Sequence, residues 1–251
     1  METTMASSER GNSPIATALS VLRCFSPDRP VLGVVEIADM VGLHKSSVSR
    51  LMGTLEAEGL VEQDPMSKKY RLSLGLLSVA GSLLSHLDVR RAALPILTDL
   101  TAATQETSSL MLWDGHAAVS VEQVPSSFPI KHTAELGVRY DTVESSCVRV
   151  FVDAMDDGER QRFCEASGVT PERLRELATD DLYGVSINIG RTMPDEVGFC
   201  AAVRDHRGIV TAAVLLSVPR YRAEIDQLAK ACRNAADDLT TSLGGFVRPT
   251  D

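Results

Sequence analysis

The stretch VGLHKSSVSRLMGTLEAEGLV (residues 41–61) predicts a helix with two unlike faces. Aliphatic side chains recur at helical spacing and predict its buried stripe: Val48, Leu51, Met52 and Leu55. The opposite face carries small hydroxyls and a guanidinium: Ser46, Ser49 and Arg50, followed by Gly53. A polar helix face of this kind is most often simply solvated. Small side chains, however, let a helix approach phosphates and base edges closely, so a surface for the DNA major groove is the alternative.

Two shorter helices are predicted before this one. Residues 14–25 place apolar side chains at helical spacing behind a Ser-Pro start signal: Ile15, Leu19, Leu22, Cys24 and Phe25. The prolines of residues 27–30 break that helix. Residues 34–41 predict a second helix, which Gly42 ends in a tight turn.

After Gly59 the hydrophobic pattern changes from helical to alternating. LVEQD, PMSKK and YRLSL (residues 60–74) predict a short hairpin with basic residues near its tip. Three helices and a small basic hairpin are typical of a winged helix-turn-helix, which we assign to residues 13–73. The residues expected in the major groove are Ser46, Ser47, Ser49 and Arg50. The residues expected to hold the DNA backbone are Lys45, Lys68, Lys69 and Arg71.

Residues 74–87 predict a linker helix with one apolar seam: Leu76, Leu77, Ala80, Leu83, Leu84 and Leu87. Because such a seam is not stable in water by itself, it must pack on a neighbouring element or on its own symmetry mate. We interpret this helix as the connection between two domains and as part of a dimer contact.

The second domain, assigned to residues 88–251, mixes helices and strands. A helix over residues 89–106 precedes two strands that meet at Asp114-Gly115, a strong hairpin signal. Residues 144–167 predict one helix, residues 196–218 a second hairpin, and residues 224–243 a terminal amphipathic helix. Strands bracketed by helices, with antiparallel neighbours, predict an α+β domain. The predicted fold is therefore α+β with two domains.

Charge and cysteine content narrow the class of protein. The net charge is −9, but the first 72 residues carry 8 basic and 9 acidic side chains, so the acid lies mainly in the remainder. A near-neutral DNA-binding domain should have low non-specific affinity. Five scattered cysteines without a C-x-x-C pair favour reduced thiols in the cytoplasm over disulfides or structural zinc. No apolar run reaches the ~18 residues of a membrane span, and residues 1–12 read as a disordered leader rather than a secretory signal.

Residues 18–80, above all ADMVGLHKSSVSRLMGTLEAEGLV (residues 38–61), resemble the N-terminal half of IclR-type bacterial transcriptional regulators. A looser similarity continues through VRRAALPILTDLTAATQETSSLMLWDG and YGVSINIGRTMPDEVGFCAAVRDHRGIVTAAVLLSVP, to about residue 243. The resemblance implies a GAF-like effector domain, homodimers or dimers of dimers, and operator binding switched by a small molecule. From the sequence as a whole we expect no cofactor and no membrane partner.

The same resemblance indicates where an effector would bind. The expected residues are Ser145, Ser146 and Cys147 at a helix start, Asn188 from a loop, and Leu215 and Ser217 from the last strand. A helix N-terminus offers N–H groups to a polar ligand, although Ser145 could simply cap the helix and Cys147 could simply be core. Many relatives carry His-Ala-Thr/Ser-Ala-x-Gly-Lys in place of VESSCVR (residues 143–149), often an acidic residue in place of Asn188, and a cysteine in place of Gly198. The pocket is therefore expected to be altered, and a carboxylate effector does not follow from the family alone.

The sequence does not favour an enzyme. It holds no P-loop, no dinucleotide-binding glycine motif, no H-E-x-x-H and no G-x-S-x-G, and its five histidines are isolated. Cys147 lies close to Arg149, which could depress a thiol pKa. The alternative is thus a small-molecule or thiol redox sensing module whose winged helix contacts protein. The favoured hypothesis is a cytoplasmic transcriptional regulator, most simply a repressor, that answers to an organic acid, an aromatic compound or a similar carbon source.

Overall fold

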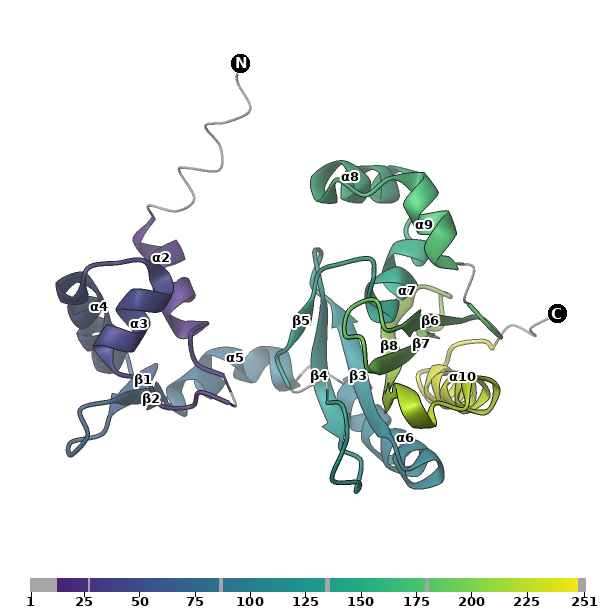
Figure 1. Cartoon of the computed structure of the whole chain (residues 1–251), viewed down its shortest axis with the longest axis horizontal. Helices are drawn as coiled ribbons and strands as arrows, with labels where there is room; N and C mark the ends of the chain where they lie inside the picture. Colours follow the sequence, from purple (N-terminus) through teal and green to yellow (C-terminus); the bar gives the residue numbers. More distant parts are fainter. Residues whose placement is uncertain (1–12, 27, 86–87, 134–135, 179–180, 248–251) are drawn as a thin grey trace, which may run out of the picture. The chain divides into compact units, whose positions relative to one another are not determined.

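The structure is a computed structural model that describes residues 13–26, 28–85, 88–133, 136–178 and 181–247. It divides into two compact units, Met1–His86 and Leu87–Asp251, which are described separately here (Figure 1). The leader predicted over residues 1–12 lies outside the described residues, as do residues 86–87 at the end of the predicted linker.

The described part of the N-terminal unit begins with three helices and a two-stranded wing, which precede the linker helix. Its elements are α2 (Pro14–Leu22), α3 (Val34–Val41), α4 (Lys45–Ala57), β1 (Val61–Gln63) and β2 (Tyr70–Leu72). The buried stripe predicted for α4 is confirmed, because Val48, Met52 and Leu55 are buried and Leu51 packs partly against them. Ile37 from α3 and Val21 from α2 complete this core. Gly42 ends α3 with φ of 67°, a conformation that favours glycine, and so produces the tight turn into α4.

The prediction of which apolar residues the first helix buries is wrong in part. Ile15 and Leu19 are 73% and 46% exposed. The face that packs runs instead through Ala18, Val21 and Leu22, and Ile15 and Leu19 fall on its flank. The N-terminal unit therefore presents apolar side chains on α2 that it does not bury itself.

The wing passes into the linker helix α5 (Gly75–Ser85) through a close backbone contact. The Ser73 hydroxyl donates to the Gly59 carbonyl at 2.5 Å and accepts from the Gly75 N–H at 3.1 Å. A Cβ on Gly75 would clash with that same carbonyl oxygen of Gly59. Early apolar side chains of the linker are exposed, with Leu77 at 55%. Leu83, Leu84 and Leu87 of the predicted seam lie outside the described side chains.

The C-terminal unit is built on a curled six-stranded antiparallel sheet in the order β5-β4-β3-β8-β7-β6. The strands are β3 (Thr107–Trp113), β4 (Ala118–Val124), β5 (Arg139–Tyr140), β6 (Val185–Ile189), β7 (Glu196–Arg204) and β8 (Val210–Pro219). The helices are α6 (Asp88–Thr104), α7 (Ser146–Ala154), α8 (Asp157–Ser167), α9 (Pro171–Leu177) and α10 (Ile225–Ser242), with the short η2 (Arg220–Arg222) after β8. Helices α6 and α10 cover one face of the sheet, and α7 lies on the other (Figure 1).

Alternation along the strands gives each face its own core. In β8, Val214 and Leu216 join the core under α10, whereas Ala213 and Leu215 join the core under α7. The α10 side is almost entirely apolar. The α7 side also receives several small polar residues, among them Ser109, Asn188 and Ser217, which could bind a polar ligand.

Two sequence predictions for this unit are wrong in detail. The single helix predicted over residues 144–167 is two helices, because Met155 is extended and the Asp156 carboxylate caps α8 by accepting the Glu159 N–H at 2.7 Å. Asn188 lies within strand β6, paired with Gly198, and not in a loop. Strand β5 and helix α9 were not expected from the sequence.

Candidate DNA-binding surface and effector site

The outward face of α4 is the first candidate site. Lys45, Ser46, Ser47, Ser49 and Arg50 are all exposed, as the sequence predicts for a surface that meets a partner. Within the part of the chain that the structure describes, the side chains of Lys45, Ser47, Ser49 and Arg50 form no hydrogen bond or ion pair. Their polar groups therefore keep their full bonding capacity for a ligand or for water.

The start of α4 is held by a histidine that the sequence analysis did not single out. His44 occupies the N-cap position, and its Nδ1 accepts the Ser46 N–H at 3.3 Å. The Ser46 hydroxyl lies 2.8 Å from the same nitrogen. Ser46 is therefore partly engaged within the protein, in contrast to Ser47 and Ser49.

The predicted basic residues of the wing differ in their environment. Lys68 forms no ion pair with a described residue, and its φ of 57° places it at the sharp turn between β1 and β2. The Lys69 ammonium lies 3.2 Å from the Glu36 carboxylate of α3, and the Arg71 guanidinium pairs with Glu62. Two of the three bases therefore meet a carboxylate of their own unit.

Glu36 makes a second interaction besides its contact with Lys69. It accepts the Gly33 N–H at 2.6 Å, which caps the start of α3. The hydrogen bond from Gly33, and after it that from Lys69, lowers the pKa of Glu36. Since an exposed ion pair of this kind is weak, Lys69 remains able to exchange its partner.

The six residues predicted for an effector site are all buried on the α7 side of the sheet: Ser145, Ser146, Cys147, Asn188, Leu215 and Ser217. A Cβ placed on Gly198 would lie 3.1 Å from Ser146 Oγ, 3.8 Å from Leu215 Cδ1 and 4.0 Å from Asn188 Cβ. Gly198 also pairs with Ser217 across β7 and β8. The start of α7 and three strands thus meet around one residue that has no side chain.

The polar groups of this cluster are only partly satisfied within it. Asn188 holds the next turn, because its Oδ1 accepts the Arg191 N–H at 3.0 Å and its Nδ2 donates to Thr192 Oγ1 at 2.6 Å. Ser145 stands at the N-cap position of α7 but makes no capping hydrogen bond through its side chain. The first N–H groups of α7 therefore gain no acceptor from that residue.

Cys147 favours the structural interpretation over the redox one. It is fully buried in the α7 core, and burial raises the pKa of its thiol to about 11. Its Sγ lies 3.0 Å from Ser145 Oγ. The Arg149 guanidinium, which could have activated the thiol, instead binds the carbonyl oxygens of Leu177 and Ile187.

Two further residues on this face were missed by the sequence analysis, and a third, Arg149, has a different role from the predicted one. Ser109 Oγ and Gln123 Nε2 are buried and have no hydrogen-bond partner among the described residues. The register pairs Ser109 with Gln123 on one side and with Leu215 on the other, so both groups share the face of the cluster. Arg149, 1% exposed, also pairs with Asp181 at 3.1 Å and ties α7 to β6. The sequence does hint at this role, because Arg149 is a charged residue inside the apolar run VRVFV.

Among the described residues, no group of His, Cys, Asp and Glu side chains gathers in a way that could hold a metal ion. None of the described helices combines the length and the hydropathy that a bilayer span requires.

A winged helix with an exposed polar face, joined to a curled-sheet domain, defines the class of two-domain transcriptional regulators. Two family models match the chain: the IclR helix-turn-helix domain over residues 15–65 and the bacterial transcriptional regulator IclR C-terminal domain over residues 81–241. The chain belongs to the IclR family of transcriptional regulators, with a DNA-binding helix-turn-helix domain and an effector-binding C-terminal domain. The resemblance and the two-domain fold inferred from the sequence are confirmed.

Curated relatives match almost the whole chain. The HTH-type transcriptional regulator XynR of Escherichia coli (strain K12) is 25% identical over 243 residues, which are 92% of this chain and 96% of that protein. The HTH-type transcriptional repressor AllR of the same strain is 24% identical over 255 residues, 96% of this chain and 94% of its own. These relatives are regulators of transcription and not enzymes.

A solved structure with the same fold is that of an IclR homolog from Microbacterium hydrocarbonoxydans complexed with 4-hydroxybenzoate. It superposes with a TM-score of 0.76 at 22% identity and covers 92% of this chain and 99% of its own. At this identity the likeness shows a shared fold, and the ligand belongs to that protein.

Proposed function

We propose that this chain binds operator DNA through the outward face of α4 and through the wing, and that an effector bound in the C-terminal unit switches this binding. The observation that carries the proposal is the exposed α4 face on which Lys45 and Arg50 have no partner among the described residues. A helix with small hydroxyls and a free guanidinium suits base edges and phosphates in the major groove. We further propose that the chain acts in the cytoplasm, where its DNA partner lies.

The proposed contacts divide into two kinds. Ser46, Ser47, Ser49 and Arg50 would read base edges, and Lys45, Lys68, Lys69 and Arg71 would hold phosphates. Of the wing bases, Lys68 would contact phosphate directly, whereas Lys69 and Arg71 would first have to release Glu36 and Glu62. We keep the domain limits inferred from the sequence. They are residues 13–73 for the DNA-binding domain, 74–87 for the linker helix and 88–251 for the effector-binding domain.

The test is a footprint and a gel shift on the DNA upstream of the chain's own gene. Arg50→Ala should reduce specific binding by about 10- to 100-fold, because a good bidentate base contact contributes roughly 1–3 kcal/mol of discrimination. Arg23→Ala, an exposed arginine of the same unit outside α4 and the wing, is the matched control and should bind normally. An unchanged footprint with Arg50→Ala would overturn the proposal.

For the effector we propose a small polar molecule held between the start of α7 and strands β6, β7 and β8. The support is the cluster around Gly198, the start of α7 without a side-chain cap from Ser145, and Ser109 Oγ on the same face, which has no partner among the described residues. Ser145, Ser146, Cys147, Asn188, Leu215 and Ser217 would line it. An organic acid or a small aromatic compound fits this mixture of hydroxyls and apolar groups.

Gly198→Val tests the effector site without touching the DNA surface. The new side chain would fill the space between Ser146 and Leu215, so the protein should still bind its operator but no longer respond to the effector. Ser217→Ala is a milder second variant that should weaken the response while preserving the fold. A full effector response in both variants would contradict the site.

We propose that the functional form is a homodimer, or a dimer of dimers, that presents two α4 helices to a pseudo-palindromic operator. The candidate contact surface consists of exposed apolar side chains on α2, on α5 and just before α5: Ile15, Leu19, Leu74, Leu77 and Val79. Repression is the simpler mode, as in the name of the relative AllR. Light scattering of the protein alone, and transcription assays with and without the protein, test these two statements.

The redox alternative is not favoured. A thiol sensor needs an accessible thiolate, whereas burial raises the pKa of Cys147, Cys200 and Cys232.

A further inference from the structure

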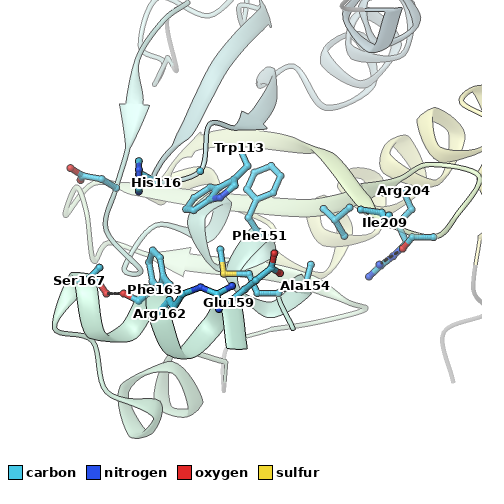
Figure 2. A pocket seen from close by; sticks show the side chains of 16 residues that line it. Trp113, His116, Phe151, Ala154, Glu159, Arg162, Phe163, Ser167, Arg204 and Ile209 are labelled. Atoms are coloured by element: carbon cyan, nitrogen blue, oxygen red, sulfur yellow. Dashed lines mark hydrogen bonds between the residues drawn. The ribbon is translucent and has the colours of Figure 1, made fainter. Parts of the chain in front are cut away.

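The C-terminal unit contains a pocket of about 890 Å³ that none of the functions above uses. Figure 2 shows it between the turn after β3, the end of α7, helix α8 and the turn that joins β7 to β8. Its volume lies within the range typical of small-molecule sites. It shares no lining residue with the six residues of the proposed effector site.

Aromatic rings form one wall of this pocket. The rings of Trp113 and Phe151 stack with centroids 5.5 Å apart and an interplanar angle of 29°. The ring of Phe163 is tilted at 58° to Trp113, with centroids 6.1 Å apart. Trp113 and Phe163 are only partly buried, so their faces remain available to a flat ligand.

Two polar groups at this wall have no partner within the described residues. The Arg162 guanidinium is exposed and forms neither a hydrogen bond nor an ion pair, and the Trp113 indole N–H has no acceptor. Of the other charged residues that line the pocket, Arg204 donates to the Gly208 carbonyl and Glu159 accepts the Asp156 N–H in the cap of α8, whereas the exposed Asp141 has no side-chain partner among the described residues. The two free groups at the aromatic wall are both donors, which suits an acceptor or an anion there.

The pocket and the proposed effector site lie at opposite ends of α7. Ser146 opens that helix, whereas Phe151 and Ala154 reach the pocket at its far end. At 1.5 Å per residue, Ser146 and Ala154 are separated by about 12 Å along the helix axis. A ligand in one site would therefore not occupy the other.

We propose that this pocket is a second ligand site of the C-terminal unit and that it takes a planar aromatic carboxylate. The ring of the ligand packs on Trp113 and Phe163, and its carboxylate accepts hydrogen bonds from the Arg162 guanidinium. The aromatic wall favours a ligand with a flat apolar ring. The free Arg162 guanidinium favours a ligand with a negative charge.

Trp113 is the chain's single tryptophan, so its indole N–H gives one signal in a ¹⁵N-correlated NMR spectrum. The full-length protein without DNA is titrated with 2-naphthoate, and in parallel with the neutral analogue 2-naphthamide. We expect 2-naphthoate to shift the indole signal in a saturable manner and to bind more tightly than the amide. No saturable shift at millimolar 2-naphthoate, or equal affinity for the amide, would overturn the proposal.

Variants locate the site. Arg162→Gln should weaken 2-naphthoate about fivefold, the upper end for an exposed charge pair, and leave 2-naphthamide unchanged. Arg175→Gln, an exposed arginine of α9 outside the pocket, is the matched control. Phe163→Ala should weaken both compounds. Equal effects of Arg162→Gln and Arg175→Gln would contradict the proposal.

A last variant separates this site from the effector site. Gly198→Val, which fills the effector cluster, should leave the indole shift and the affinity for 2-naphthoate unchanged. Loss of the shift in that variant would assign the binding to the effector site and overturn the proposal. Because no DNA is present, the result does not depend on whether operator binding itself is correct.

Discussion

The two units differ in where their candidate binding residues place polar side chains: exposed in the N-terminal unit and buried in the C-terminal unit. On α4 of the N-terminal unit, the side chains of Ser47, Ser49 and Arg50 lie exposed and have no partner among the described residues, while Val48, Met52 and Leu55 pack the helix onto the core. In the C-terminal unit, Ser146 and Asn188 are buried under α7, and buried polar groups must be satisfied or reserved for a ligand. The recognition that we propose for the first unit uses a surface. The recognition that we propose for the second unit uses an interior.

The largest effect is expected where the interior carries a charge. Arg149→Met should lower the unfolding free energy of the C-terminal unit by about 3–5 kcal/mol, because it leaves two carbonyl groups and Asp181 without their partner. Urea unfolding followed by Trp113 fluorescence reports on that unit alone, since the chain has one tryptophan. Arg175→Met on the exposed side of α9 is the control, with a change within about 0.5 kcal/mol. Equal stability of the two variants would show that the buried charge contributes nothing.

A smaller loss is expected at the joint of the N-terminal unit. Gly75→Ala places a Cβ against the Gly59 carbonyl and should destabilise the wing and α5 by about 1–3 kcal/mol, as overpacking does. Hydrogen exchange over residues 59–75 measures the effect. The matched control is Gly53→Ala on α4, where a Cβ meets open space. Unchanged exchange rates in Gly75→Ala would contradict the close contact.

At the surface the expected changes are modest. Glu36→Gln should release Lys69 for phosphate, keep an acceptor for the Gly33 N–H, and raise operator affinity about threefold. The gain should shrink as salt is added. Glu58→Gln removes the same charge from a residue that has no ion pair, and serves as the control. If both variants gain affinity equally, the pairing of Lys69 is not what limits its contact with DNA.

The smallest signal is expected from the buried thiols. With its pKa raised to about 11 by burial, Cys147 has roughly 0.1% thiolate at pH 8, so iodoacetamide should leave it unmodified in the folded protein. Cys164, which is only half buried, should react first. Mass spectrometry after timed alkylation distinguishes them. Modification of Cys147 ahead of Cys164 would restore the redox alternative.

The same contrast explains what sequence could predict. The period of Val48, Met52 and Leu55 fixes which face of α4 is outward, because one amphipathic helix has only one stable way to bury its stripe. The exposure of Ile15 escaped prediction, since it depends on how α2 meets its neighbours. The helix break at Met155 was not predicted, because it depends on a single capping residue, Asp156. A helical spacing of apolar residues does not show that such a cap is present.

The interior was harder to predict for a physical reason. A small polar residue such as Ser109 or Asn188 has no distinctive spacing, and its meaning arises only when strand register brings it beside Gly198 and Ser146. The resemblance to relatives, and not periodicity, pointed to Ser146 and Asn188, and nothing in the sequence pointed to Ser109. Their roles toward a ligand remain predictions.

The contact of Ser73, Gly59 and Gly75 has a mechanical consequence. Gly59 follows the last turn of α4, and Gly75 begins α5, so the two helices are connected by one close backbone approach and by the Ser73 hydroxyl that bridges it. Because a Cβ at position 75 would overlap the Gly59 carbonyl oxygen, little room remains for α5 to turn independently of the end of α4. A rotation of α5 would therefore carry the end of α4 with it.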